Sequence, residues 1–83
     1  MTWEVPWEPA ALDEATGFLE DDPEGVDTLL QATGRLTEDP GPGGSRAWGA
    51  HRRRLHRGPW RVLYRVDEES RTLHAEHVGR ARA

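Results

Sequence analysis

Hydrophobic residues recur at helical spacing through the first half of the chain. Leu12, Ala15 and Phe18 follow Pro9 with a period near 3.6, and proline is well tolerated in a first helical turn. A second stripe of the same spacing consists of Val26, Leu29, Leu30, Thr33 and Leu36. Between the stripes, residues 21–24 read as a cap, a proline and an acidic first turn. The pattern predicts two amphipathic helices, the second ending near residue 37, joined by a tight turn.

The second half alternates with a period of two, which is typical of half-buried strands. A strand predicted over 60–66 places on one face the residues Trp60, Val62, Tyr64 and Val66. A polar turn over 67–70 leads to a returning strand over 72–78. A further strand over 48–56 precedes them and pairs with the first across the turn 57–60.

Two other segments complete the predicted order of elements. Residues 2–7 are expected to form an edge strand or a strand end, because Pro6 cannot donate to a ladder. The Pro- and Gly-rich run 38–44 cannot continue a helix and is expected to be a loop. The predicted fold is a single α+β domain over 1–83 with the order β-α-α-β-β-β. Its two helices pack on one face of an antiparallel sheet.

The register of the central hairpin follows from parity. If His56 lies opposite Arg61, then Arg52 lies opposite Arg65. Alternation then gathers on the outer face Arg52, Arg54, His56, Arg61 and Arg65. A slip by one residue would drive these arginines into the core, so the register is well specified. Arg53 falls on the core side, where its long stem is expected to reach the edge of the sheet.

Charge divides unevenly along the chain. Residues 1–40 hold eleven Asp or Glu and one Arg, whereas residues 41–83 hold ten Arg and four Asp or Glu. Facing arginines repel in an isolated sheet, and guanidinium groups suit phosphate geometrically. The outer face therefore indicates a polyanion site. The alternative is a solvated face whose arginines are compensated by the acidic helices. One exposed ring among the four Trp could stack on a nucleic-acid base.

Other classes of protein fit the sequence poorly. Without cysteine there is no disulfide scaffold, iron–sulfur cluster or thiolate zinc site. His51 and His56, and likewise His74 and His77, stand an odd number of residues apart, so each pair is expected on opposite faces of its strand and no metal site is predicted. No run approaches the roughly 20 apolar residues of a membrane span, and the N-terminus is not a signal peptide. We expect a cytoplasmic protein without membrane association or cofactor.

Two stretches of the sequence carry a family resemblance. Residues 58–68, Gly-Pro-Trp-Arg-Val-Leu-Tyr-Arg-Val-Asp-Glu, and 76–80, Glu-His-Val-Gly-Arg, resemble the signature of the RelE/ParE superfamily. These proteins are toxins of toxin–antitoxin modules in bacteria and archaea. Residues 7–12, Trp-Glu-Pro-Ala-Ala-Leu, and the loop 38–40 are also similar. The resemblance covers nearly the whole chain and implies the RelE-like fold, whose order of elements matches the one predicted above.

The RelE branch of this superfamily implies an endoribonuclease that enters the ribosomal A site and cuts messenger RNA. The reaction is attack by a ribose 2′-hydroxyl on the adjacent phosphate, without a metal ion. On this chain the resemblance assigns Arg52 and Arg54 to the basic pair of the second strand, Arg61 to the arginine after the aromatic residue, and Arg80 to the slot after Val-Gly. We expect catalysis from Arg54, Arg61 and Arg80, with His56, opposite Arg61, as the titrating group. We expect RNA binding from Arg52, Arg57, Arg65 and Arg82.

The end of the sequence departs from the family pattern. Ala81 stands where the family usually has Arg, and no tyrosine follows, although many RelE-like enzymes use one there. Two alternatives therefore stay open within the superfamily: a ParE-like inhibitor of DNA gyrase, and a degenerate toxin that only binds its antitoxin. A general RNA-binding module is a third. The resemblance also implies the partners, which are a cognate RelB- or Phd-like antitoxin with an acidic C-terminal segment, forming a hetero-oligomer with the toxin, and the ribosome with its messenger RNA.

Overall fold

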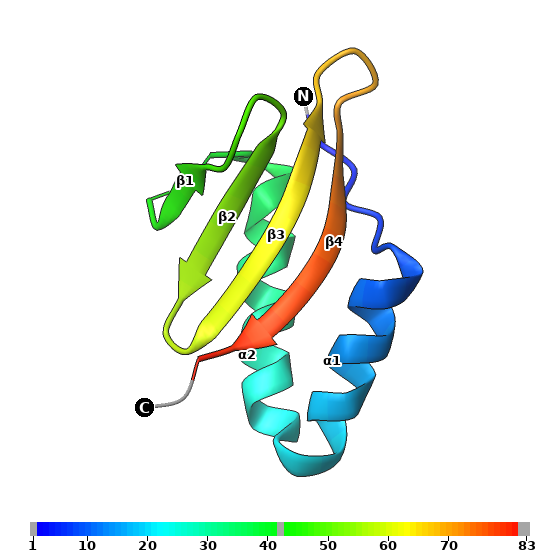
Figure 1. The fold of residues 1–83 in the computed structure, drawn as a ribbon, viewed down its shortest axis with the longest axis vertical. Helices are drawn as coiled ribbons and strands as arrows, with labels where there is room; N and C mark the ends of the chain where they lie inside the picture. Colours follow the sequence, from blue (N-terminus) through cyan, green and yellow to red (C-terminus); the bar gives the residue numbers. More distant parts are fainter. Residues whose placement is uncertain (1, 42, 82–83) are drawn as a thin grey trace.

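Two helices lie side by side behind one face of a four-stranded sheet (Figure 1). The computed structural model describes residues 2–41 and 43–81. The helices are α1 (Pro9–Asp21) and α2 (Pro23–Gly34), followed by one 3-10 turn, η1 (Arg35–Thr37). The strands are β1 (Ser45–Ala47), β2 (Arg52–Arg57), β3 (Trp60–Asp67) and β4 (Thr72–Arg80). The predicted α+β class, with both helices on one face of an antiparallel sheet, is confirmed.

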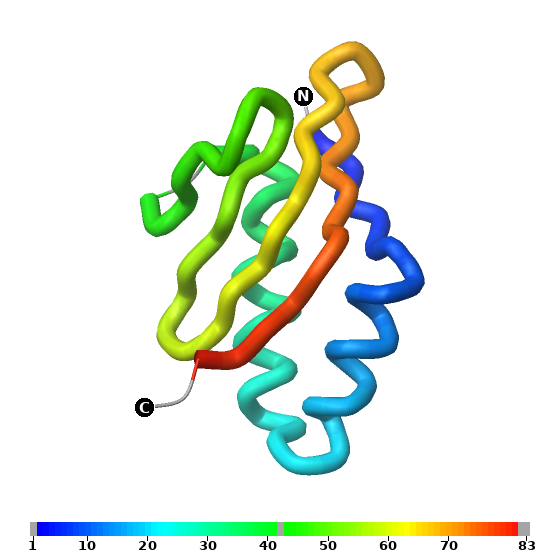
Figure 2. Tube along the Cα trace, in the orientation of Figure 1, coloured from blue at the N-terminus to red at the C-terminus, as the bar shows by residue number. Residues whose placement is uncertain are grey.

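The turn between the helices has the predicted capping chemistry. Pro23 begins α2, and the Asp22 side chain accepts a hydrogen bond from Gly25 N at 2.9 Å. This bond satisfies one of the amide groups that a helix N-terminus leaves without an intrahelical partner. The cap ends α1 and starts α2 within two residues, which holds the helices antiparallel as Figure 2 shows.

The strands form a meander in the order β1-β2-β3-β4, antiparallel throughout. Each predicted pair of the central hairpin is found, including His56 opposite Arg61 and Arg52 opposite Arg65. The strand predicted over 48–56 is shorter, because β2 begins at Arg52. The chain before it turns back through Gly49, which has a φ of +86°, and pairs β1 with β2. The strand β1 was not predicted.

The segment before α1 runs parallel to β4 as an extended edge. Backbone bonds join Glu4 to Arg71 and Leu73, and residues 6 and 8 to Ala75. Proline has no N–H to donate, so the ladder is interrupted at Pro6 and leaves two isolated bridges, at Glu4 and Trp7. The predicted edge strand is therefore an extended segment rather than a regular strand.

The core lies between the sheet and the helices. Its fully buried large side chains are Trp60, Tyr64, Leu29, Leu36, Leu55, Leu73 and Val62. Phe18 of α1 meets Trp60 edge-on, with ring centroids 5.2 Å apart. Such aromatic contacts contribute about 1 kcal/mol beyond simple burial. The inner face of the sheet is thereby committed to packing, which leaves chemistry to the outer face.

A β-bulge in β4 changes which side chains reach the outer face. Leu63 pairs with His77, but the next residue, Tyr64, pairs with Ala75, so Glu76 is the extra residue. Before the bulge the odd positions Leu73 and Ala75 are buried; after it the even position Val78 is buried. An extra residue inverts the alternation of a strand. His74 and His77 therefore share the outer face, and the prediction that they point to opposite faces is wrong.

Candidate nucleic-acid interface

Three arginines from three strands meet on the outer face around one histidine. Arg46 of β1 lies opposite Arg54 of β2, and His56 of β2 lies opposite Arg61 of β3. Arg46, Arg54 and Arg61 are called the arginine cluster below. All three guanidinium groups act electrostatically on the His56 imidazole. The outer-face grouping predicted for Arg54, His56 and Arg61 is thus present, and Arg46 is added to it.

The environment of His56 disfavours its protonated form. The pKa of His56 lies below its ordinary value of 6.5, first because of desolvation and then because of the charges of Arg61, Arg54 and Arg46. An imidazolium there would stand beside three fixed positive charges. The ring is therefore neutral at pH 7 and can accept a proton.

Close packing at Gly44 holds β1 against His56. The amide of His56 donates to Gly44 O at 2.8 Å. Gly44 has a φ of +93°, and a Cβ on it would stand 2.8 Å from His56 O. Glycine is therefore required for the close approach that places Arg46 in the cluster.

A buried phenol ties the same strand to the core. The Tyr64 hydroxyl donates to Pro40 O at 2.6 Å and lies 2.7 Å from Ser45 Oγ. Arg53 reaches the same serine, donating from Nε to Ser45 Oγ at 2.8 Å and from Nη2 to Ser45 O at 3.1 Å. The Arg53 side chain therefore reaches the edge strand β1, as predicted. Tyr64 is fully buried on the inner face, so its phenol is not part of the outer face.

An exposed tryptophan extends the cluster. Trp48 follows β1 and is 53% exposed, and the Arg54 guanidinium lies 4.8 Å from its ring centroid. Arg61 bends back toward its own turn, donating from Nη1 to Gly58 O at 2.8 Å and to Trp60 O at 2.9 Å. A guanidinium held on an aromatic face keeps donor groups free for a further partner. The sequence did not indicate which of the four Trp rings is exposed, and the structure shows that it is Trp48.

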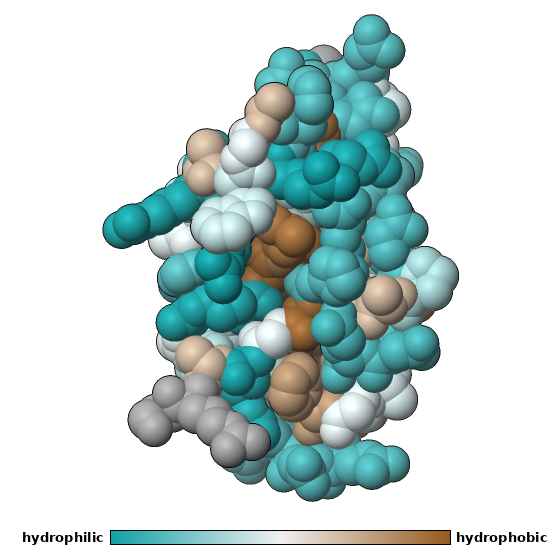
Figure 3. All heavy atoms as spheres, viewed as in Figure 1, coloured by the Kyte–Doolittle hydropathy of each residue, from teal (hydrophilic) through white to brown (hydrophobic). Residues whose placement is uncertain are grey.

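These groups border a shallow hollow of about 380 Å³. It is lined by Glu14, Trp48, Arg54, Arg61, Leu63, His77, Val78 and Gly79. Figure 3 looks onto this face and shows hydrophobic residues at its centre, bordered by hydrophilic ones. A floor of apolar atoms with cations at its rim suits a base and its phosphate.

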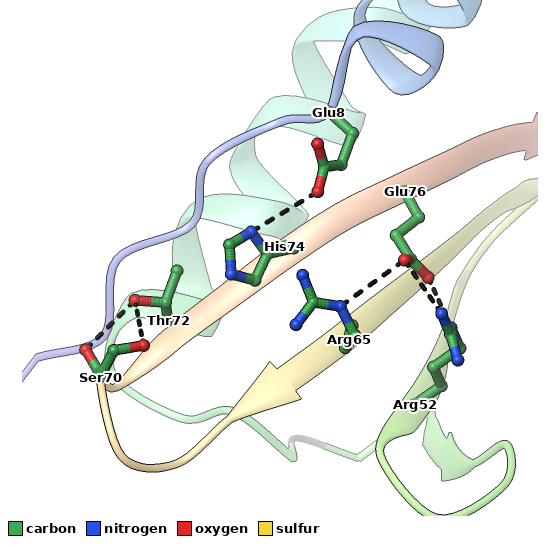
Figure 4. Close-up of polar contacts among 7 residues, drawn as sticks. All are labelled: Glu8, Arg52, Arg65, Ser70, Thr72, His74 and Glu76. Atoms are coloured by element: carbon green, nitrogen blue, oxygen red, sulfur yellow. Dashed lines mark hydrogen bonds and ion pairs between the residues drawn. The ribbon is translucent and has the colours of Figure 1, made fainter.

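The other two outer-face arginines are already paired. Arg52 donates from Nε to Glu76 Oε1 at 2.7 Å, and Arg65 Nε lies 3.8 Å from Glu76 Oε2 (Figure 4). The hydrogen bond from Arg52 is the main reason that the pKa of Glu76 lies below its ordinary value. The positive charges of Arg52, Arg65 and His77 lower it further by smaller amounts. The anion that this facing pair of arginines requires is supplied by the protein itself. Arg52 and Arg65 lie on the predicted face. Because the Glu76 carboxylate offsets their positive charge, they are not counted in the arginine cluster.

Two further predicted site residues lie on the helix side of the sheet. Arg80 is opposite Trp60, contacts Asp22 Oδ2 at 3.3 Å and lies 5.0 Å from the Phe18 ring centroid. The bulge is the reason, because it turns even positions after residue 76 inward. Arg57 borders a small hollow beside α2. The structure therefore does not bring Arg80 and Arg57 to the cluster, and Arg82 lies outside the described residues.

Sequence reasoning missed Arg46 and the outer position of His77. The signal for Arg46 was weak, because β1 has three residues and follows a Gly-rich loop. No feature of the sequence indicated the bulge. Within residues 2–41 and 43–81, no three His, Asp or Glu side chains lie close enough together to hold a metal ion. In the same part of the chain, no helix is long and apolar enough to cross a membrane.

Comparisons with known proteins bear on the family and the fold of this chain. The family model described as the ParE toxin of type II toxin–antitoxin system, parDE, matches residues 7–83. No curated protein sequence matches the chain.

Solved toxin structures share the fold. The toxin–antitoxin complex RelBE2 from Mycobacterium tuberculosis superposes with a TM-score of 0.83 at 21% identity, covering 96% of this chain and 99% of that one. The isolated E. coli RelE toxin gives 0.78 at 17% identity, covering 98% and 86%. The archaeal RelE–RelB complex from Pyrococcus horikoshii OT3 gives 0.74 at 17% identity, covering 96% of each chain. Because the family model spans nearly the whole sequence and these structures share its fold, the chain belongs to the RelE/ParE superfamily of toxins from type II toxin–antitoxin systems.

Proposed function

We propose that this toxin is an endoribonuclease that cuts messenger RNA in the A site of the ribosome. The observation that carries the proposal is the arginine cluster around a neutral His56, beside the exposed ring of Trp48. This arrangement supplies what cleavage by an internal 2′-hydroxyl needs. It offers cations for the phosphate, a proton acceptor for the hydroxyl, and an aromatic surface for a base.

Each group has a distinct role in the proposed reaction. Arg54 and Arg61 hold the scissile phosphate and stabilise the charge that develops on its oxygens. Arginine cannot act as the base at neutral pH, because its pKa lies above about 12. His56 accepts the proton of the 2′-hydroxyl, which its depressed pKa permits at pH 7. The O2′ atom then attacks phosphorus in line, leaving a 2′,3′-cyclic phosphate.

The remaining predicted residues have weaker support. Arg46 extends the cluster toward the neighbouring phosphate. Arg52 and Arg65 can bind RNA only if the RNA displaces the Glu76 carboxylate from them. The roles of Arg80 in catalysis and of Arg57 and Arg82 in RNA binding stay predictions, without support from the geometry described above.

A cognate antitoxin is the proposed partner. Leu12 and Leu19 of α1 and Leu30 of α2 are each about half exposed, so the helices retain apolar surface. The arginine cluster would attract an acidic segment of such a partner. Two of the similar solved structures are toxin–antitoxin complexes, RelBE2 and RelE–RelB. We propose that this toxin is likewise neutralised in a hetero-oligomer in the cytoplasm.

Mapping of messenger RNA 5′ ends in a ribosome-programmed cell-free reaction tests the activity. The wild-type protein should create discrete new ends only when ribosomes are present, and Arg61→Ala should abolish them. Arg35→Ala, on the helix side in η1, is the matched control for loss of one positive charge. If the folded protein creates no new ends, the ribonuclease proposal fails.

The second candidate is inhibition of DNA gyrase. It is favoured by the match to the ParE family model and by the position of Arg80 away from the cluster. Supercoiling by purified gyrase in the presence of the toxin distinguishes the two functions. Loss of supercoiling without new RNA ends would support gyrase inhibition.

A further inference from the structure

A histidine–carboxylate pair lies at the rim of the hollow that holds Arg54 and Arg61. His77 Nδ1 lies 3.3 Å from Glu14 Oε1, and the same oxygen accepts a hydrogen bond from Val78 N at 3.1 Å. His77 comes from β4 and Glu14 from α1, 63 positions earlier in the chain. Both residues line the hollow together with the two arginines.

The pair has the geometry of an oriented proton carrier. A carboxylate oxygen accepts, so the hydrogen in this contact is on Nδ1, and Nε2 is the nitrogen left for a further partner. The Val78 amide holds Glu14 Oε1 in place. His77 is 61% exposed and Glu14 38% exposed, so neither side chain is consumed by the core. A solvated imidazole fixed on one side is free to exchange its proton on the other.

The sheet register puts His77 across the cluster from His56. His56 is opposite Arg61 on β2, whereas His77 is opposite Leu63 on β4. Two strand spacings and two residues along the strand separate their Cα atoms by on the order of 12 Å. The strand β3, with Arg61 and Leu63, lies between them. A phosphate bound over β3 in the hollow, within reach of Arg54 and Arg61, would therefore have His56 on its β2 side and His77 on its β4 side.

We infer that His77 is a further catalytic residue, the donor of a proton to the 5′-oxygen leaving group, and that Glu14 positions it. The inference rests on the proposed ribonuclease function. In the step, O2′ gives its proton to His56 and forms a bond to phosphorus. The bond from phosphorus to O5′ breaks, and the imidazolium form of His77 gives its Nε2 proton to O5′ while keeping the Nδ1 hydrogen that faces Glu14. The products are a 2′,3′-cyclic phosphate and a 5′-hydroxyl, and one proton returns through water from His56 to His77.

Charged groups around His77 belong to each element that packs near it. Glu14 faces it from α1, Glu76 precedes it on β4, and Arg54 and Arg61 share its hollow from β2 and β3.

The decisive experiment replaces the leaving oxygen by sulfur. A synthetic messenger RNA with one 5′-bridging phosphorothiolate at the position that the wild-type protein cuts is compared with the ordinary RNA on ribosomes, in single-turnover reactions. A thiolate leaves without being protonated. The His77→Gln variant should therefore cleave the ordinary RNA about 100-fold or more slowly than the wild-type protein does. It should cleave the sulfur RNA at nearly the wild-type rate. Glu14→Gln should show the same pattern with a smaller loss.

Matched controls separate this role from a structural one. His74 on the same face of β4 lies 3.6 Å from Glu8, and it is opposite Arg65 rather than beside the hollow. His74→Gln and Glu8→Gln should cleave both RNAs at wild-type rates. Arg61→Ala should lose cleavage of both, because it acts on the phosphate.

Each other outcome overturns the inference. Equal losses on both RNAs for His77→Gln would give His77 a binding or structural role. Unchanged cleavage of the ordinary RNA would remove it from the reaction while leaving the ribonuclease proposal intact. If the wild-type protein cuts neither RNA, the inference and the proposed function fail together.

Discussion

Glu76 Oε1 accepts a hydrogen bond from Arg52 Nε at 2.7 Å although β3 runs between their two strands. The contact is possible because Glu76 is the extra residue of the bulge in β4. The Glu76 side chain is only 19% exposed. Arg65 lies on the intervening strand and approaches the same carboxylate. One acidic residue thereby compensates two facing arginines.

The first prediction is that Glu76→Gln destabilises the fold in a pH-dependent way. The pKa of Glu76 is lowered from 4.5, so its stabilisation is present above pH 4.5 and is lost as the pH falls through the folded value. At pH 7 the variant should lose up to about 1 kcal/mol, since the pair is partly exposed. Urea unfolding at pH 7 and at acid pH checks this. The control is Glu68→Gln in the exposed β3–β4 turn, and an equal loss at both pH values would contradict the prediction.

The second prediction concerns the titration of His56. Its pKa in the folded protein should lie below 6.5 and should rise in Arg61→Ala, because one repelling charge is removed. The imidazole signal followed by NMR against pH gives both values directly. Arg35→Ala on the helix side should leave the titration where it is. A value at or above 6.5 in the wild-type protein would remove the basis for a neutral His56.

The third prediction links a buried hydroxyl to RNA binding. Tyr64→Phe removes the donor to Pro40 O and the partner of Ser45 Oγ, so it should cost about 1–2 kcal/mol of stability. It should also weaken RNA binding, since β1 carries Arg46. Urea unfolding and fluorescence anisotropy with a labelled oligonucleotide measure the two effects. Thr33→Val removes a buried hydroxyl from α2 instead, and it should leave the affinity for RNA unchanged.

The fourth prediction is that Trp48 contributes to RNA affinity through its ring. Trp48→Ala should weaken binding of a single-stranded oligonucleotide by about tenfold, because base stacking contributes about 1–3 kcal/mol. Trp48→Phe should retain most of the affinity. Anisotropy titrations at one fixed salt concentration compare the three proteins. Equal affinity of Trp48→Ala and the wild-type protein would show that bases do not contact this ring.

The register of the central hairpin could be predicted from the amino-acid sequence alone, and the reason is energetic. Only one parity keeps Leu55 and Val62 inside and Arg54 and Arg61 outside, because a slip by one residue exchanges the two faces and buries charge. Helical periodicity and the Asp22–Pro23 cap similarly determined the two helices. These features depend on local pattern and on the cost of burying polar groups, both of which are legible in one sequence.

The bulge could not be predicted in the same way. Nothing in the run 73–78 marks Glu76 as the residue without a partner, because its effect depends on pairing with β3 and on the two arginines beside it. One extra residue moved His77 outward and Arg80 inward. Arg46 was missed for a related reason, since a strand of three residues gains its order from its neighbour rather than from its own sequence.

The pairing of residues 4–8 with β4 has a consequence for the order in which the protein is made. The first segment of the chain receives its backbone partners from one of the last, Arg71 to Ala75. Synthesis proceeds from the N-terminus, so α1 and α2 emerge long before the strand that supports them. Glu14 likewise waits for Val78. The sheet that carries the arginine cluster is therefore complete only after β4 has been translated. A nascent chain that still lacks β4 does not have the complete outer face.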